Sequence, residues 1–219
     1  MITRSYRGGR SLSRRFREAR FRRFLPLIDD IIERKGGCRI ADIGGSRYYW
    51  DIISDFVQTR PIEIHLINRE HDAAANDAFV NIIGDATSLT DHADNSFDFV
   101  HCNSVIEHVG GWNEMQRTAT EIRRLAPAYY VQTPNFWFPY EPHFRCVFFH
   151  WLPEQIRIRL VMRFALGFAD RKNTISEAVA RVQSARLIDQ AQMRALFPDA
   201  AHSAERVFGS KKSLIAIRS

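Results

Sequence analysis

Apolar residues follow two alternating patterns along this chain, and together they predict a parallel sheet covered by helices. Short apolar runs typical of buried strands occupy residues 38–42, 62–67, 78–83, 97–102 and 129–133. Apolar residues at helical spacing predict helices over residues 13–35, from a loop at 44–50 through 56, and over 112–125. Strands that alternate with helices pair in parallel and bury both faces of their sheet. The expected fold is therefore α/β and Rossmann-like, with helices on both faces.

The ends of the chain carry further signals. Ser13 is a plausible N-cap for the first helix, and Gly36 and Gly37 end it, while Pro26 is expected to kink or split it. The last segment, ERVFGSKKSLIAIR, has two apolar runs around a Gly-Ser-Lys-Lys turn. It predicts a C-terminal antiparallel hairpin.

We expect two regions in the chain. Residues 1–36 form a basic N-terminal arm and helix, and residues 37–219 form the main domain. Within that domain, an aromatic- and arginine-rich stretch at about 134–182 is expected to be an insertion at the carboxyl edge of the sheet. Its segment Glu154–Phe168 predicts either a lid helix, a helix on a membrane surface, or a helix packed on the domain with its arginines at the solvent.

Composition narrows the class of protein. The 219 residues are 45% apolar and 26% charged, which indicates a folded domain and excludes a disordered chain or a disulfide miniprotein. No apolar run reaches the length of a membrane span, and the start lacks the apolar segment of a secretory signal. The three cysteines, odd in number and widely spaced, are expected to be reduced thiols. These features predict a cytoplasmic protein.

The positive charge is concentrated at the start of the chain. Residues 1–24 hold nine Arg and one Glu, so this segment has a net charge of +8. The whole chain has a net charge of +6, so the remaining residues have a net charge of −2. The main domain therefore does not have the charge of a nucleic-acid binder. The charge of the arm suits peripheral contact with the anionic inner face of a membrane. The alternative is that the arm is a solvated basic segment.

Small or polar residues close four consecutive predicted strands. In an open α/β sheet, ligands bind at the carboxyl ends of the strands, near the point where the strand order reverses. Glycines there let the backbone turn and approach a ligand. The candidate ligand-binding residues are Asp42, Gly44, Gly45 and Ser46 after the first strand, Asn68 after the second, Asp85 and Ala86 after the third, and Asn103 and Ser104 after the fourth.

Four segments contain or follow these strand ends: IADIGG, GDATSL, SFDFVHCNSVIEHVGGW and EIRRLAPAYYVQTPN. With these segments the chain resembles the class I S-adenosylmethionine-dependent methyltransferases of the type 11 methyltransferase-domain family, over about Arg39 to Ile217. It is closest to a bacterial subgroup with a GGS-plus-Trp first loop, NSVIEHVGGW, TPNFWFPYEPHF and a terminal KSLIAIR. The resemblance implies a mostly parallel seven-stranded sheet with an antiparallel C-terminal hairpin.

The resemblance also implies S-adenosylmethionine as the cofactor and a role for each strand end. Asp42 would orient the first loop and face the methionine amino group, and Gly44 and Gly45 would let the loop pass beside the cofactor. Asn68 would stand at the ribose hydroxyls. Asp85 and Ala86 would contact the adenine, and Asn103 and Ser104 would line the floor near the methionyl chain.

Two departures from the family pattern stand out. Ser46 and Tyr48 occupy the second and third glycine positions of Asp-x-Gly-x-Gly-x-Gly, and Asn68 replaces the acid at the ribose. The Asn68 amide still accepts and donates hydrogen bonds, and Glu70 lies two residues further on. A dinucleotide oxidoreductase is disfavoured, because no G-x-G-x-x-G opens a helix to seat a pyrophosphate.

Three residues are candidates for catalysis: His143, His108 and Glu107. A hydroxyl acceptor must lose its proton during methyl transfer, and histidine suits that task near neutral pH. Glu107 and His108 could instead cap the turn after the fourth strand. Glu141 lies two residues before His143 and could orient it, while aromatic residues of the same loop would wall the acceptor pocket.

A metal is not assigned. Some related methyltransferases hold a divalent ion with a Glu-x-x-Glu-His cluster at this point, but Ser104 replaces the first Glu here. His143 would bring the number of ligands to three.

The sequence thus predicts a methyltransferase that O-methylates a sugar, a glycolipid or another small polar acceptor. Two alternatives stay open: a non-catalytic binding or scaffold protein with this fold, and an RNA methyltransferase that uses the basic arm.

Overall fold

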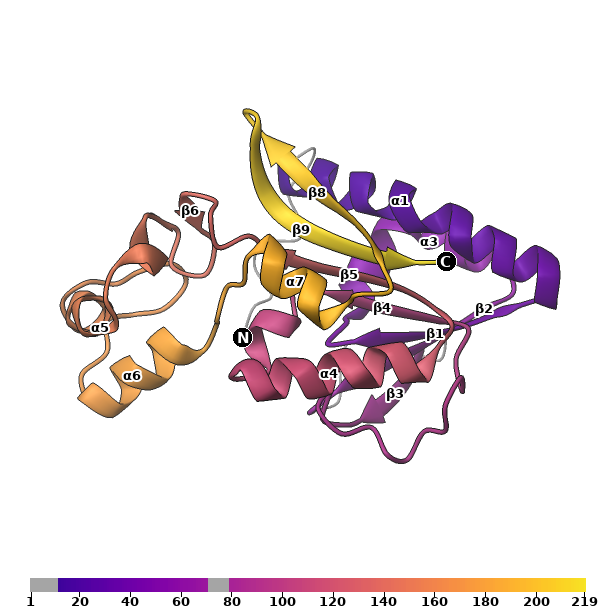
Figure 1. The fold of residues 1–219 in the computed structure, drawn as a ribbon, viewed down its shortest axis with the longest axis horizontal. Coiled ribbons are helices and arrows are strands. Elements are labelled where there is room, and N and C mark those ends of the chain that lie inside the picture. Colours follow the sequence, from indigo (N-terminus) through magenta and orange to yellow (C-terminus); the bar gives the residue numbers. More distant parts are fainter. Residues whose placement is uncertain (1–11, 71–78) are drawn as a thin grey trace. The chain divides into compact units, whose positions relative to one another are not determined.

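The chain folds around a seven-stranded sheet with the order β3-β2-β1-β4-β5-β9-β8 (Figure 1). The structure, a computed structural model, describes residues 12–70 and 79–219, with side chains from Phe16 onward. The strands of this sheet are β1 (Cys38–Ile43), β2 (Ile62–Asn68), β3 (Phe79–Ile83), β4 (Phe99–Asn103), β5 (Ala128–Pro134), β8 (Ala201–Val207) and β9 (Ser210–Arg218). The prediction of a mostly parallel seven-stranded sheet with an antiparallel C-terminal hairpin is confirmed.

The strand order reverses beside β1. From β1 the chain runs outward through β2 and β3, which pair in parallel, and then returns to β4 on the other side of β1. β1 and β4 are parallel as well, with Ile43 opposite Cys102. The carboxyl ends of β1 and β4 therefore flank the switch point at which open α/β sheets bind ligands.

The turn of the C-terminal hairpin begins one residue earlier than the sequence pattern indicates, and it is shorter. β8 and β9 pair from Ala201 opposite Ile217 to Val207 opposite Ser210. The two residues between the strands, Phe208 and Gly209, have φ of 48° and 80°. Positive φ at both central residues is the signature of the tight type I′ turn, so the turn is Phe-Gly and not Gly-Ser-Lys-Lys.

The first helix, α1 (Leu12–Lys35), continues through Pro26 without a break. Of the two expected effects of Pro26, the split is therefore wrong and the kink stays a prediction. Ser13 lies within the described helix and does not precede it. A proline in a helix removes one backbone hydrogen bond. Burial of the apolar face on both sides of it, at Phe21, Phe24, Ile28 and Ile31, offsets that loss.

The segment after β1 is more broken than predicted. It forms α2 (Arg47–Trp50), one 3₁₀ turn η1 (Asp51–Ile53) and α3 (Ser54–Gln58) instead of one helix. Further along, the predicted helix 112–125 is confirmed as α4 (Trp112–Leu125), while α5 (Glu154–Arg163) ends before Phe168. The remaining elements are η2 (Ile106–His108), β6 (Tyr140–Glu141), β7 (Cys146–Val147), η3 (Phe149–Trp151), α6 (Ile175–Gln183) and α7 (Gln190–Leu196). The basic arm before residue 12 lies outside the described residues, and its expected role stays a prediction.

Contacts divide the chain into two compact units. The first holds the residues up to Cys102 and Ile122–Tyr130, and the second holds Asn103–Glu121 and Val131–Arg218. In the first unit Phe24 of α1 packs against Phe99 of β4 and Tyr130 of β5, with ring centroids 5.7 and 4.9 Å apart. This helix thus covers one face of the sheet.

The second unit contains a small core of its own within the expected insertion. Phe144 and Phe149 stack with centroids 4.2 Å apart and pack with Val161 of α5 and with Ala178 and Val182 of α6. The aromatic stretch is therefore a folded part of the protein and not a linker. Among the described residues, none of the helices is both long and apolar enough to cross a bilayer.

The three cysteines differ in accessibility. Cys38 and Cys102 are buried, and Cys146 is partly accessible. Burial, followed by the charge of Asp98, raises the pKa of Cys38 to about 12.

We predict that iodoacetamide at pH 8 modifies only Cys146 in the folded protein, because the thiolate is the reactive form. Mass spectrometry of the labelled protein measures this, and unfolding in guanidinium should expose all three thiols. The Cys146→Ser variant should stay unlabelled while folded. Rapid modification of Cys38 would contradict this account of the core.

Candidate functional site

A buried carboxylate organises the first loop of the sheet. Asp42, at 1% exposure, accepts a hydrogen bond from Trp50 Nε1 at 2.7 Å on one oxygen and from His101 Nδ1 at 2.6 Å on the other. The His101 ring in turn lies parallel to Tyr130, with centroids 5.6 Å apart. Asp42 therefore joins the end of β1 to α2 and to β4. This gives its expected loop-orienting role a physical basis, and its contact with a cofactor stays a prediction.

The loop after Asp42 is shaped for glycine. Gly44 has φ of +67°, and a Cβ on Gly45 would lie 1.7 Å from Asp42 Oδ2. A side chain at Gly45 would thus collide with the carboxylate that holds the loop in place. Ser46 follows, before α2, and its hydroxyl does not cap that helix.

Asn68 connects the ends of β2 and β1. Its side-chain amide donates a hydrogen bond to the carbonyl of Gly45 at 2.9 Å. An aspartate or glutamate has no hydrogen to donate there, so the amide explains why this chain departs from the family acid. The side-chain oxygen of Asn68, Oδ1, remains as a potential acceptor, and its contact with a ribose stays a prediction.

Asp85 sits in a tight turn after β3, just before Ala86. One carboxylate oxygen accepts from the backbone N–H and the hydroxyl of Thr87, at 2.9 and 2.8 Å. The other pairs with Arg69 at 3.0 Å. The Thr87 hydrogen bonds first, and the Arg69 charge second, lower the pKa of Asp85, so the group is a fixed anion. The adenine contacts expected of Asp85 and Ala86 stay predictions.

The end of β4 is held in an uncommon backbone conformation. Ser104, which follows Asn103, has φ of 57°, in the left-handed region that serine rarely adopts. Its backbone N–H donates to the Gln132 carbonyl at 2.8 Å, and its hydroxyl donates to the Gln132 side chain at 3.0 Å. Backbone strain that neighbours hold in place is typical of ligand sites.

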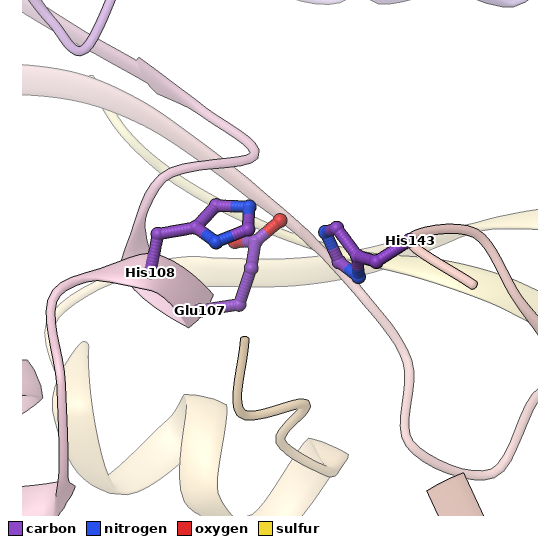
Figure 2. A group of neighbouring side chains, drawn as sticks. All are labelled: Glu107, His108 and His143. Carbon is purple, nitrogen blue, oxygen red and sulfur yellow. The ribbon is translucent and has the colours of Figure 1, made fainter. Parts of the chain in front are cut away.

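The three predicted catalytic residues come together in the second unit. Glu107 and His108, from η2, and His143, from the loop after β6, each place a potential ligand or base atom within 4.8 Å of the others. Figure 2 shows the Glu107 carboxyl group between the two imidazole rings. The rings are nearly perpendicular, with centroids 4.7 Å apart.

Each member of this cluster has a defined partner. Thr133 donates its hydroxyl to Glu107 Oε2 at 2.9 Å, and burial raises the pKa of this carboxyl. His108 Nδ1 donates to the Ser184 carbonyl at 2.7 Å. His143 Nδ1 donates to Glu141 at 2.6 Å, the orienting contact that the sequence suggested. The side-chain bonds of Glu107 and His108 thus run to other segments and do not cap η2.

A cavity of about 810 Å³ lies in the second unit. Its walls include aromatic side chains and several charged or amide groups, among them Phe136, Trp137, Glu141, Phe149, His150, Arg157, Arg186, Asp189 and Gln192. The sequence predicted that aromatic residues of this loop would wall a pocket. Arg186, Asp189 and Gln192 were missed, because they come from a stretch around α7 with no motif.

Removing the charge of Asp42 is the sharpest test of the loop. In an Asp42→Asn variant, the new amide hydrogens face either Trp50 Nε1, which is a donor, or His101 Nδ1. His101 Nδ1 can accept only if the ring proton moves to Nε2, which is buried and has no hydrogen-bond partner in the described part of the chain. We predict a loss of about 1–3 kcal/mol of unfolding free energy, the cost of an unpaired buried group. Guanidinium denaturation measures it. Asp51→Asn, an exposed carboxylate, should change stability by less than about 0.5 kcal/mol, and an equal loss in both variants would refute this role of Asp42.

Comparison with known proteins agrees with this architecture. A family model described as a methyltransferase domain matches residues 54–127. Two uncharacterized Mycobacterium tuberculosis proteins, from strains CDC 1551 / Oshkosh and H37Rv, are 40% identical over 48 residues. That match spans 22% of this chain and 16% of each relative.

Solved structures share the fold at low identity. A SAM-dependent methyltransferase from Methanosarcina mazei has a TM-score of 0.55 at 13% identity, with 88% of this chain and 95% of that chain covered. The 1,6-didemethyltoxoflavin-N1-methyltransferase of Burkholderia thailandensis has a TM-score of 0.51 at 11% identity, with 88% and 76% covered. A chain described as a Zn-dependent alcohol dehydrogenase from Rhodobacter sphaeroides has a TM-score of 0.54 at 14% identity, with 95% and 100% covered.

At these identities the structures establish the fold alone, and the family model adds the assignment. With its match to the methyltransferase-domain model over residues 54–127 and its seven-stranded sheet ending in an antiparallel hairpin, this chain contains a methyltransferase domain with the class I S-adenosylmethionine-dependent fold.

Proposed function

We propose that this chain transfers the methyl group of S-adenosylmethionine to a hydroxyl of a sugar, a glycolipid or another small polar acceptor. The observation that carries the proposal is the tight first loop at the carboxyl end of β1. There Gly44 has a positive φ, and the Asp42 carboxylate, held by Trp50 and His101, leaves no room for a side chain at Gly45. When bound, the cofactor supplies a methyl group on a positively charged sulfur.

The strand ends suit the polar groups of this cofactor. The Asn68 carbonyl oxygen is an acceptor for a ribose hydroxyl, since the amide hydrogens are turned toward Gly45. Asp85 is a fixed anion with a side chain 46% exposed, so it can accept a hydrogen bond from an exocyclic amine such as that of adenine. These residues bind and orient the cofactor, and orientation supplies much of the rate in a displacement reaction.

Methylation of a hydroxyl needs a group that takes up its proton. As the new C–O bond forms and the C–S bond breaks, the acceptor proton must leave. Glu107, His108 and His143 form the cluster in the second unit that suits this task. Glu141 holds His143 in one tautomer, with Nδ1 protonated and Nε2 free to accept.

The 810 Å³ cavity suits a carbohydrate acceptor. Trp137 and Phe136 offer aromatic faces, while Glu141, Arg157 and Asp189 offer the charged groups that hydrogen-bond sugar hydroxyls. Its volume lies in the range of small-molecule sites, roughly 300–1,000 Å³. Glu141 both lines this cavity and holds His143, so cavity and cluster share a residue.

A lipid-linked form of the acceptor agrees with the exposed aromatic residues around β6 and η3. Trp137, Phe148 and Trp151 are 64%, 51% and 40% exposed, and the last two lie 5.0 Å apart. Large aromatic side chains at the surface are typical of proteins that meet the interface of a bilayer. Membrane contact of the basic arm remains a separate proposal.

Cofactor binding is the first test of this function. We expect isothermal titration of the full chain with S-adenosylmethionine or S-adenosylhomocysteine to show one site, and Asp85→Ala to weaken it about tenfold, which is the loss of one charge-assisted hydrogen bond of about 1.5 kcal/mol. Asp91→Ala, an exposed carboxylate in the next loop, should bind as the wild type does. No binding by the folded wild type would favour a scaffold protein instead.

The acceptor site has its own test. Transfer of radiolabelled methyl from the cofactor to a panel of oligosaccharides, glycolipids and RNA should label a saccharide. For that acceptor, Trp137→Ala should raise KM about tenfold and leave kcat nearly unchanged, because stacking holds substrate and transition state alike. Phe168→Ala, 78% exposed and outside the cavity, is the matched control. Labelling of RNA alone would refute the proposed acceptor class.

A further inference from the structure

We propose that Glu107, His108 and His143 bind one divalent first-row transition-metal cation. The three side chains place a ligand atom each within 4.8 Å of one another, and all three belong to the second unit (Figure 2). Two imidazole nitrogens and one carboxylate oxygen form a ligand set known from zinc and non-haem iron sites.

Hydrogen bonds fix both histidines in the tautomer that a metal requires. A carbonyl oxygen only accepts, so the contact of His108 Nδ1 with the Ser184 carbonyl puts the proton on Nδ1. The Glu141 carboxylate does the same for His143 Nδ1. Both Nε2 atoms therefore keep their lone pairs for a ligand. A metal-bound histidine almost always donates its other N–H to a carboxylate or a carbonyl, as both do here.

These supporting groups are themselves held rigidly. Glu141 is 2% exposed, and its second oxygen accepts the backbone N–H of Phe144 at 2.6 Å. His143 is thus oriented by a carboxylate that cannot turn away without losing a buried hydrogen bond. Rigid supporting contacts of this kind raise metal affinity, since the ligands lose less freedom on binding.

The third ligand has an atom that nothing in the described residues satisfies. Glu107 is 1% exposed and uses Oε2 to accept from Thr133, while Oε1 is buried and has no hydrogen-bond partner. An orphaned buried carboxylate oxygen is costly and rare in a native protein. A cation at the cluster would satisfy this oxygen and neutralise the carboxylate charge.

The mixed ligand set selects the class of cation. Imidazole suits zinc, iron, cobalt and nickel, whereas magnesium and calcium prefer oxygen ligands alone. Metal–ligand bonds are about 2.0–2.2 Å long, so the three side chains would close in slightly on binding. Three protein ligands leave a coordination position open, as in catalytic metal sites.

The open position gives the cation a role that rests on the proposed function. A hydroxyl bound to a divalent cation loses its proton more readily, so the cation would let the acceptor release its proton to water while the two histidines serve as ligands rather than as bases. Binding of the cation itself does not depend on which acceptor is used.

Cobalt(II) is the probe, because it binds zinc-type sites and gives a visible absorption spectrum. We expect metal-stripped full-length protein to bind one equivalent of Co²⁺ in this spectrum and by calorimetry, and excess Mg²⁺ not to displace it. Glu107→Gln and His143→Gln should each lower the affinity at least about 100-fold, and Glu141→Gln about 10–100-fold, the usual effect of a supporting residue. His202→Ala, a histidine outside the cluster, should bind as the wild type does.

Equal binding by the wild type and the cluster variants would show an adventitious ion only and overturn the proposal. No binding by the folded wild type would also overturn it and leave the histidines as bare bases. Should Glu107→Gln fail to fold, His108→Gln and His143→Gln decide the matter, because neither side chain is buried. S-adenosylmethionine titrations with and without Co²⁺ run in parallel, so loss of the cation site is distinguished from failure of the methyltransferase proposal.

Discussion

The first unit depends on one buried carboxylate. Asp42 lies one residue before the end of β1 with its carboxylate shielded from water, and two N–H donors among the described residues, from Trp50 and His101, make that burial tolerable. The position of the carboxylate in turn decides the next residues, because it leaves no room for a Cβ at Gly45. A chain that keeps this anion must therefore keep both aromatic donors and the glycine, whatever else changes in the loop.

The second unit uses a different arrangement for a similar purpose. Its buried acids are Glu107 and Glu141. Glu107 accepts a hydrogen bond from a neighbouring hydroxyl on one oxygen, and its other oxygen faces the cluster. Glu141 accepts a backbone N–H on one oxygen and an imidazole N–H on the other. In the first unit a buried charge is fully occupied and shapes the chain. In the second unit, one carboxylate oxygen has no hydrogen-bond partner among the described residues. A buried polar atom without a partner is typical of functional sites, where a ligand can bind it.

The sequence predicted the sheet, the hairpin and α4 well, because apolar runs and helical spacing are local signals. The turn at Phe208 and Gly209 escaped, since a left-handed phenylalanine has no local signature. The positions of Glu107, His108 and His143 after the fourth and fifth predicted strands put them at one edge of the sheet. Their approach to within 4.8 Å of one another is a tertiary contact that no spacing along the chain predicts. The donors to Asp42 and the Asn68 contact with Gly45 could not be predicted at all, because tertiary contacts choose among many equivalent polar partners.

Glu141 has one further consequence. It lies in the wall of the 810 Å³ cavity and at the same time sets the tautomer of His143. A guest molecule that draws this carboxylate toward itself would release the imidazole, and a guest that leaves it in place would keep the imidazole aligned. If the acceptor binds in this cavity, as proposed, its fit would therefore affect the orientation of a ring outside the cavity, through the hydrogen bond between Glu141 and His143.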